Sequence, residues 1–171
     1  MYNAGDYGVA SKHYQEAIPL ISALFGPTAF KLADYHERAG LALRHLAQLD
    51  QALRHFNQAL SIYRTIYSDQ PHPSVASCMF LIAGTLGLQG KLDEAEAMFE
   101  EVLGIQMLVF RPPISRIGMM DTLEVLDWIA SEKHEPVKEL EYLTMQLEVA
   151  EEHYGTPDFP GAEEKWLEVA E

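Results

Sequence analysis

The stretch Ala47-Gln-Leu-Asp-Gln-Ala-Leu-Arg-His-Phe-Asn-Gln-Ala-Leu60 decides the fold, because the chain contains its pattern three times. The other two copies are Gly5–Ile18 and Gly90–Leu103. Each copy has a large apolar residue, an alanine three positions later and an aromatic residue four positions after that. Alanine or valine and then isoleucine or leucine complete the pattern. An internal repeat of this kind determines the architecture before any single residue is considered.

The matched residues follow one another at offsets of three and four, which places them on one stripe of a helix. The equivalent alanines, Ala10, Ala52 and Ala95, lie 42 and 43 residues apart. Another helical stretch precedes the second and third copies, with Gly40 or Ala83 at the position where we expect the paired helices to cross. The sequence therefore predicts a repeated unit of helix A, short turn and helix B.

This unit resembles the tetratricopeptide repeat (TPR). The matching residues are Gly40, Ala52, Phe56 and Ala59 in one unit and Ala83, Gly90, Ala95 and Phe99 in the next. The period of 42–43 residues and the segment His72-Pro-Ser-Val-Ala76 are similar to the kinesin-light-chain type of the repeat. The resemblance implies an all-α fold, a right-handed α-solenoid of antiparallel helix pairs with about seven or eight helices.

We expect one solenoid domain over residues 1–171, with well-matched repeats at 4–26, 29–68 and 73–108. A degenerate fourth unit covers 112–154, where Pro112-Pro113 and Glu135-Pro136 are placed to begin two helices. A further helix begins within 160–171. Because a repeat is cut short at each end, we expect the chain to be a fragment of a longer protein, or a short chain whose open end is covered by a partner.

The composition excludes several classes of protein. Of the 171 residues 48% are hydrophobic, which is typical of a globular chain. The lone cysteine, Cys78, cannot form an internal disulfide, and the sequence has no apolar run long enough to span a bilayer. We therefore expect a cytoplasmic (intracellular) protein that is not inserted in a membrane.

The net charge of −14 is confined to the second half of the sequence. Residues 1–85 carry six acidic and six basic residues, whereas residues 86–171 carry 20 acidic and six basic residues. Such a chain repels nucleic acid and anionic membranes, since both require clustered basic side chains. The acidic excess serves solubility or favours basic partners.

No residue pattern points to catalysis, a metal or a cofactor. His36, His45 and His55 are separated by nine and ten residues, which does not place two of them together on one helical face. We interpret His36 as a packing residue between helices. The glycines Gly84, Gly87 and Gly90 are not preceded by the strand that a phosphate-binding loop needs. Close helix packing is the favoured explanation of Gly84 and Gly87, and a bare patch on the inner surface is the alternative. We predict that the protein is not an enzyme.

The resemblance also implies a binding surface, because helix A lines the concave groove in this class of repeat. The predicted groove residues are Glu37, Arg38, Leu41, Arg44, His45, Phe80, Leu81, Gly84 and Leu88. We predict a non-catalytic scaffold that binds a protein or peptide ligand, basic or amphipathic, in this groove. Packing of Phe80 and Leu81 on a neighbouring helix is the alternative for those two residues.

Two other functions remain open. One is an assembly role, with homo-oligomerisation through the helix ends, or docking or oligomerisation through the apolar run Ile105–Phe110 and the degenerate fourth unit. The other is a regulatory module of a larger protein whose catalytic domain is absent.

Overall fold

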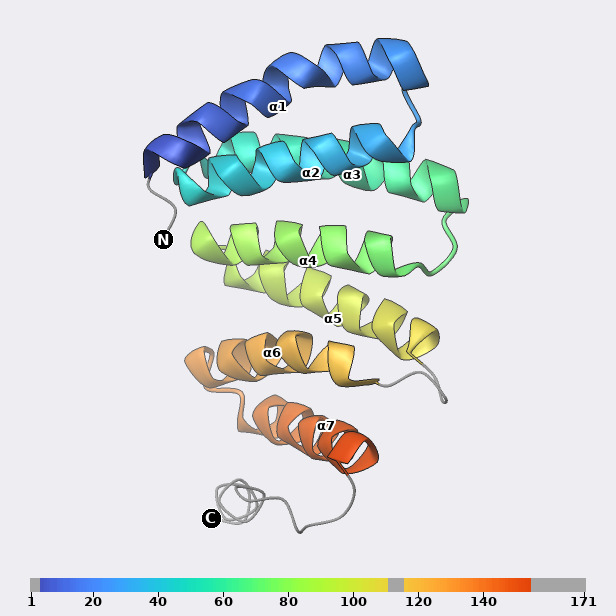
Figure 1. Ribbon diagram of the computed structural model, residues 1–171. Coiled ribbons are helices and arrows are strands. Elements are labelled where there is room, and N and C mark those ends of the chain that lie inside the picture. Colours follow the sequence, from blue (N-terminus) through green and yellow to red (C-terminus); the bar gives the residue numbers. More distant parts are fainter. Residues whose placement is uncertain (1–3, 111–115, 155–171) are drawn as a thin grey trace. The chain divides into compact units, whose positions relative to one another are not determined.

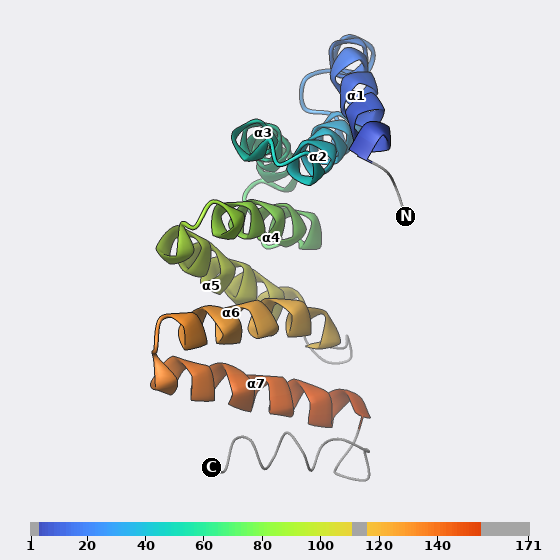
Figure 2. The same ribbon diagram turned by 90° about the vertical axis from the view of Figure 1, so that its left-hand side faces the viewer.

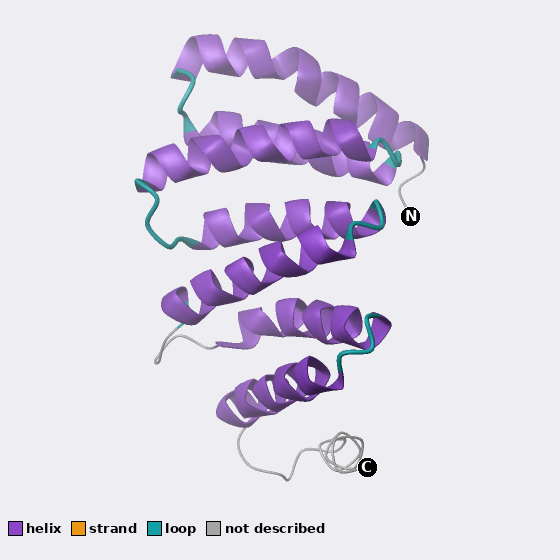
Figure 3. Cartoon of the chain, turned by 180° about the vertical axis from the view of Figure 1, so that it is seen from behind, coloured by secondary structure: helices purple, strands orange, loops and turns teal. Residues whose placement is uncertain are grey.

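A computed structural model describes residues 4–110 and 116–154 of the chain. These residues form seven α-helices and one short 3-10 turn, with no strand (Figures 1 and 3). The helices are α1 Ala4–Phe25, α2 Phe30–His45, α3 Leu49–Tyr67, α4 Pro73–Leu88, α5 Leu92–Val109, α6 Met120–Glu132 and α7 Pro136–Tyr154, and the 3-10 turn is Arg116–Met119. The predicted all-α fold of helix pairs is confirmed. The further helix expected within 160–171 and the Pro112-Pro113 start lie outside the described residues.

The chain divides into two compact units. Unit 1 extends to Met98 and contains α1 to α4 with the start of α5; unit 2 begins at Phe99 and contains the rest of α5 with α6 and α7. That residues 1–171 form one domain stays a prediction.

In unit 1, α2 lies between α1 and α3, and α3 in turn packs on α4 (Figure 2). The spacing that recurs in the three copies of the sequence pattern explains this packing, because it places Ala52, Phe56 and Ala59 of α3 on one side of the helix, where all three are completely buried. Gly40 of α2 faces the ring of Phe56 so closely that a Cβ atom there would lie 2.6–3.0 Å from ring carbons. The predicted helix crossing at Gly40 is confirmed, and a larger residue there would have to displace the Phe56 ring.

Ala10 of α1 differs from its two equivalents. Ala52 and Ala95 have no exposed surface, whereas Ala10 is half-buried. The described residues include no helix before α1 that could cover Ala10 as α2 covers Ala52.

Helix α4 begins at the segment that resembles the kinesin-light-chain repeat. Pro73 takes the first helical position, where its missing N–H costs nothing, and His72 is the N-cap. The backbone N–H of Ser74 donates to Nδ1 of His72 over 3.1 Å, and the imidazole stacks on the ring of Tyr67, with centroids 3.4 Å apart. The motif therefore caps one helix and attaches it to the end of the previous one.

Three helix pairs are joined by turns of the same geometry. These turns join α2 to α3, α4 to α5 and α6 to α7. The central residue of each turn has a positive φ, in that order Ala47 (58°), Gly90 (76°) and His134 (56°). The backbone N–H of the next residue donates to a carbonyl five residues earlier, as from Gln48 to Leu43 and from Glu135 to Ala130, both over 2.9 Å. The degenerate fourth unit therefore keeps the turn although it has lost the sequence pattern.

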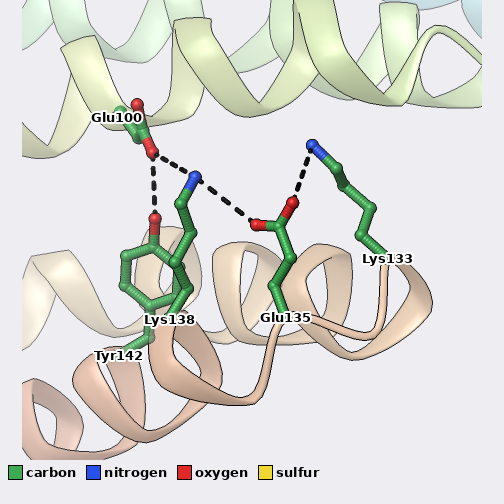
Figure 4. Close-up of polar contacts among 5 residues, drawn as sticks. All are labelled: Glu100, Lys133, Glu135, Lys138 and Tyr142. Carbon is green, nitrogen blue, oxygen red and sulfur yellow. Dashed lines mark hydrogen bonds and ion pairs between the residues drawn. The ribbon is translucent and has the colours of Figure 1, made fainter.

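Unit 2 has an aliphatic core and a polar link between α5 and α7. The core side chains are large, and Leu123, Leu126, Ile129 and Val149 are almost completely buried. Glu100 of α5 accepts hydrogen bonds from the Lys138 ammonium over 3.2 Å and from the hydroxyl of Tyr142 over 3.1 Å (Figure 4). Glu135 continues the network, with Lys138 on one side at 3.6 Å and Lys133 on the other at 3.5 Å.

Candidate functional site

The predicted groove residues lie on α2 and α4, two A-type helices of unit 1 (Figure 1). The structure brings the two helices together at Arg44 and Gly84, where a Cβ atom on Gly84 would lie 3.7 Å from a guanidinium nitrogen of Arg44. This is ordinary contact distance. Close helix packing therefore does not require glycine at position 84, and Gly87 has similar room, since its nearest neighbour would be the Cβ of Ala95 at 4.0 Å.

The α2 end of this surface carries charges that are already engaged. Arg38 donates from Nε to both carboxylate oxygens of Asp34, over 2.9 and 3.0 Å. The Glu37 carboxylate accepts a hydrogen bond from the Tyr63 hydroxyl of α3 over 3.2 Å. Partial burial raises the pKa of Glu37. Arg38 and Glu37 are thus partly committed to contacts within the fold.

Arg44 differs from these two residues. It is half-buried, and desolvation lowers the pKa of its guanidinium. Its guanidinium forms no hydrogen bond or ion pair with any residue that the structure describes. A half-buried cation without a partner is poised to donate to a carbonyl or carboxylate that a ligand supplies. The neighbouring His45 is exposed and stacks on the ring of Tyr7, with centroids 4.2 Å apart.

The apolar residues among the predicted groove residues differ in how much of their surface is exposed. Leu41 of α2 and Phe80 and Leu81 of α4 are half-buried, whereas Leu88 at the end of α4 is 63% exposed. The carbonyl of Leu81 accepts the hydroxyl of Thr85 over 2.6 Å. Leu88 is therefore the most accessible apolar anchor of the nine predicted residues.

A histidine pair that the sequence did not predict connects α2 and α3. His36 of α2 and His55 of α3 approach across the helix pair until their Nδ1 atoms are 3.0 Å apart. Burial, with a smaller contribution from His55, lowers the pKa of His36 to about 4, and burial also lowers the pKa of His55. Both rings are therefore neutral at pH 7, one donating to the other. The interpretation of His36 as a packing residue is confirmed, since only 7% of its surface is exposed.

His36 also lies in the wall of a cavity of about 720 Å³ between α1, α2 and α3. Ile18, Leu32 and Ile62 supply apolar lining, and Arg54 and Asn57 supply polar groups. None of the nine groove residues is among those that line this cavity. It is a separate feature of unit 1.

Other chemistry finds little support in the described part of the chain. No group of three or more metal-ligating side chains occurs there. Cys78 is buried, and its thiol donates to the carbonyl oxygen of Phe56 over 3.3 Å. Burial raises the pKa of Cys78 to about 12, so the nucleophilic thiolate is scarce at neutral pH. No described helix has both the length and the hydropathy needed to cross a bilayer.

Comparisons with known proteins agree with the geometry. Models of the tetratricopeptide repeat match residues 1–65 and 75–106. This chain belongs to the tetratricopeptide repeat family. The sequence has no significant match among curated proteins.

Solved structures show the same fold. One is BtubC (BKLC) from P. vanneervenii, with a TM-score of 0.80 and 16% identity; the alignment covers 91% of this chain and 61% of that one. This chain therefore spans less than two thirds of the length of BtubC. Another is a protein of Podosopora anserina with nearly identical kinesin light chain TPR-like repeats, at a TM-score of 0.77 and 15% identity, with 97% and 77% of the two chains covered. The fold of this TPR chain is accordingly that of kinesin-light-chain-like α-solenoids.

Proposed function

We propose that this TPR chain is a non-catalytic scaffold that binds a peptide or an amphipathic helix on the α2–α4 surface. The general role in protein–protein interaction follows from the repeat family. The finer proposal rests on two residues of this surface, the half-buried Arg44, whose guanidinium has no partner among the described residues, and Leu88, which is 63% exposed. One supplies a directional donor and the other an apolar anchor, which together select an amphipathic ligand.

Glycine at position 84 suits this role. It leaves Arg44 uncovered by any α4 side chain at that position, so a ligand backbone can approach the guanidinium. We further propose that the protein acts in the cytoplasm, in keeping with a single cysteine that cannot form an internal disulfide.

The test begins with selection of peptides from a random twelve-residue library on the immobilised chain. We expect Leu88→Asp and Arg44→Met each to weaken the selected peptides about ten-fold or more, as truncation of an interface anchor does. Leu24→Asp is the matched control, because Leu24 is 75% exposed on α1 and lies outside the surface. Circular dichroism verifies that each variant keeps its helical content. Peptides whose affinity is insensitive to both Leu88 and Arg44 would contradict the proposal.

An assembly role is the second candidate, and one observation favours it. Met107 and Leu108 of α5 are 44% and 50% exposed in the apolar run Ile105–Phe110. Phe110 of the same run is engaged within unit 2, because a Cβ on Gly118 would lie 3.2 Å from its ring. If the run joins subunits, Leu108→Asp should lower the mass measured by light scattering; a wild-type chain that is already monomeric excludes the role.

A further inference from the structure

The exposed face of α6 in unit 2 has an unusual composition. The helix contains four acidic residues and no basic residue. Its buried side is formed by Thr122, Leu123, Leu126, Ile129 and Ala130. Helical periodicity places Asp121, Glu124, Trp128 and Glu132 on the opposite side. We refer to these four residues as the Trp128 face.

Trp128 occupies the middle of this face and is 52% exposed. Glu124 precedes it by four residues and Glu132 follows it by four, so one carboxylate lies a helical turn away on each side. Asp121, Glu124 and Glu132 are exposed, and their carboxylates make no hydrogen bond or ion pair in the part of the chain that is described. An exposed indole flanked by unpaired carboxylates is thus available to a partner.

The chemistry of the face favours a cation. The face of an indole ring attracts ammonium and guanidinium groups, and tryptophan does so most strongly among the aromatic residues. Glu132 also lies in the last turn of α6, where the helix dipole adds negative potential. A cation near the end of a helix is favourable; α6 contains none, and its C-cap residue Lys133 pairs with Glu135 over 3.5 Å. An acidic ligand would be repelled here, and a purely apolar one would leave the carboxylates unpaired.

We propose that the Trp128 face binds a basic segment of a partner protein. A lysine or arginine side chain lies over the Trp128 indole, and neighbouring basic side chains pair with Glu124 and Glu132. The proposal is independent of the α2–α4 surface, which lies in unit 1 and carries different residues. It assigns a role in binding to acidic residues that otherwise serve only solubility.

The experiment uses the full chain and a fluorescently labelled peptide of six arginines, with binding followed by anisotropy. We expect Trp128→Leu to weaken binding about two- to five-fold, because leucine keeps the apolar character but has no aromatic face, whereas Trp128→Tyr keeps most of the affinity. Trp166→Leu, a change of the other tryptophan in the sequence, should leave the affinity within about two-fold of wild type.

The acidic residues are tested with a charge-matched control. Glu124→Gln with Glu132→Gln should weaken the six-arginine peptide about three- to ten-fold. Glu148→Gln with Glu151→Gln removes the same charge from exposed positions of α7 and should change the affinity less than about two-fold. Equal effects of the two double variants, or an unchanged affinity in Trp128→Leu, would show attraction to bulk charge and overturn the proposal.

Discussion

The α2–α3 pair of unit 1 and the α6–α7 pair of unit 2 have the same turn geometry, but different side chains hold the two pairs together. In α2–α3, Gly40 admits the ring of Phe56, and the small residues Ala39, Ala52 and Ala59 are completely buried. In α6–α7, the buried residues are mainly large aliphatics, and the polar link from Glu100 ties α7 to α5. The small–aromatic pattern is therefore one way to build the helix pair and is not required for it.

The close contact between Gly40 and the Phe56 ring, which we call the steric interlock, should be the point of unit 1 where a substitution costs most stability. Gly40→Ala places a methyl group within about 3 Å of the buried Phe56 ring. We expect a loss of about 1–3 kcal/mol in the free energy of unfolding, from overpacking, measured by urea denaturation with circular dichroism. Phe56→Leu in the same chain should recover part of the loss, since it removes the ring that clashes. A Gly40→Ala chain as stable as the wild type would refute the interlock.

The histidine pair gives unit 1 a pH dependence. Burial holds the pKa of His36 at about 4 in the folded chain, against 6.5 for a free side chain. The unfolded chain therefore takes up the proton first, and the stability that neutral His36 confers is complete above about pH 6.5 and is lost as the pH falls toward 4. We expect unfolding to become about 1–2 kcal/mol easier between pH 7 and pH 5.

The control for this prediction removes both rings. His36→Phe with His55→Leu eliminates the pair without leaving one imidazole unpartnered. The fall in stability from pH 7 to pH 5 should shrink in this double variant. An equal fall in both chains would assign the pH dependence to other groups.

The shared turn allows the units to be compared directly. Ala47 in unit 1 and His134 in unit 2 hold positive φ angles that disfavour side chains, whereas Gly90 holds its angle without strain. Ala47→Gly and His134→Gly should each stabilise the chain by about 0.5–1 kcal/mol, and Gly90→Ala should destabilise it by a similar amount. Thermal unfolding monitors all three variants, and a change of sign in either unit would show that the turns are not equivalent.

Gly84→Ala provides the counterpart to Gly40→Ala. Both glycines lie within A-type helices, yet Gly84 has ordinary contact distance to its one neighbour, Arg44. Alanine should therefore stabilise the helix by up to about 1 kcal/mol, through its higher helix propensity. Destabilisation in the same urea assay would mean that Gly84 serves packing after all.

The polar link of unit 2 should contribute least. Lys138 and Glu100 are partly exposed, with side-chain exposures of 39% and 46%, so their ion pair is screened by solvent. We expect Glu100→Gln to cost about 0.5–1 kcal/mol at low salt and less in 1 M NaCl. A loss as large as that of Gly40→Ala would show that unit 2 depends on this contact as unit 1 depends on its interlock.

The sequence determined the helices and their pairing in the well-matched repeats. Apolar residues at offsets of three and four define the buried stripes locally, and the recurrence of Ala52 and Ala95 at one period identifies repeated units. Gly40 could be assigned to the helix crossing for the same reason. For the candidate site, the repeat pattern predicted which positions of α2 and α4 line the groove, but it did not predict which of these side chains are exposed.

Only the tertiary structure decided contacts between residues far apart in the sequence. The approach of His36 to His55, the room beside Gly84 and the unpartnered state of Arg44 each depend on how one helix rotates against another. In the fourth unit the turn at His134 was not visible either, because a positive φ at a residue other than glycine leaves no signal in the sequence. Periodicity fixes which face of a helix is buried, whereas the distances across a helix pair are set by the packing of both partners.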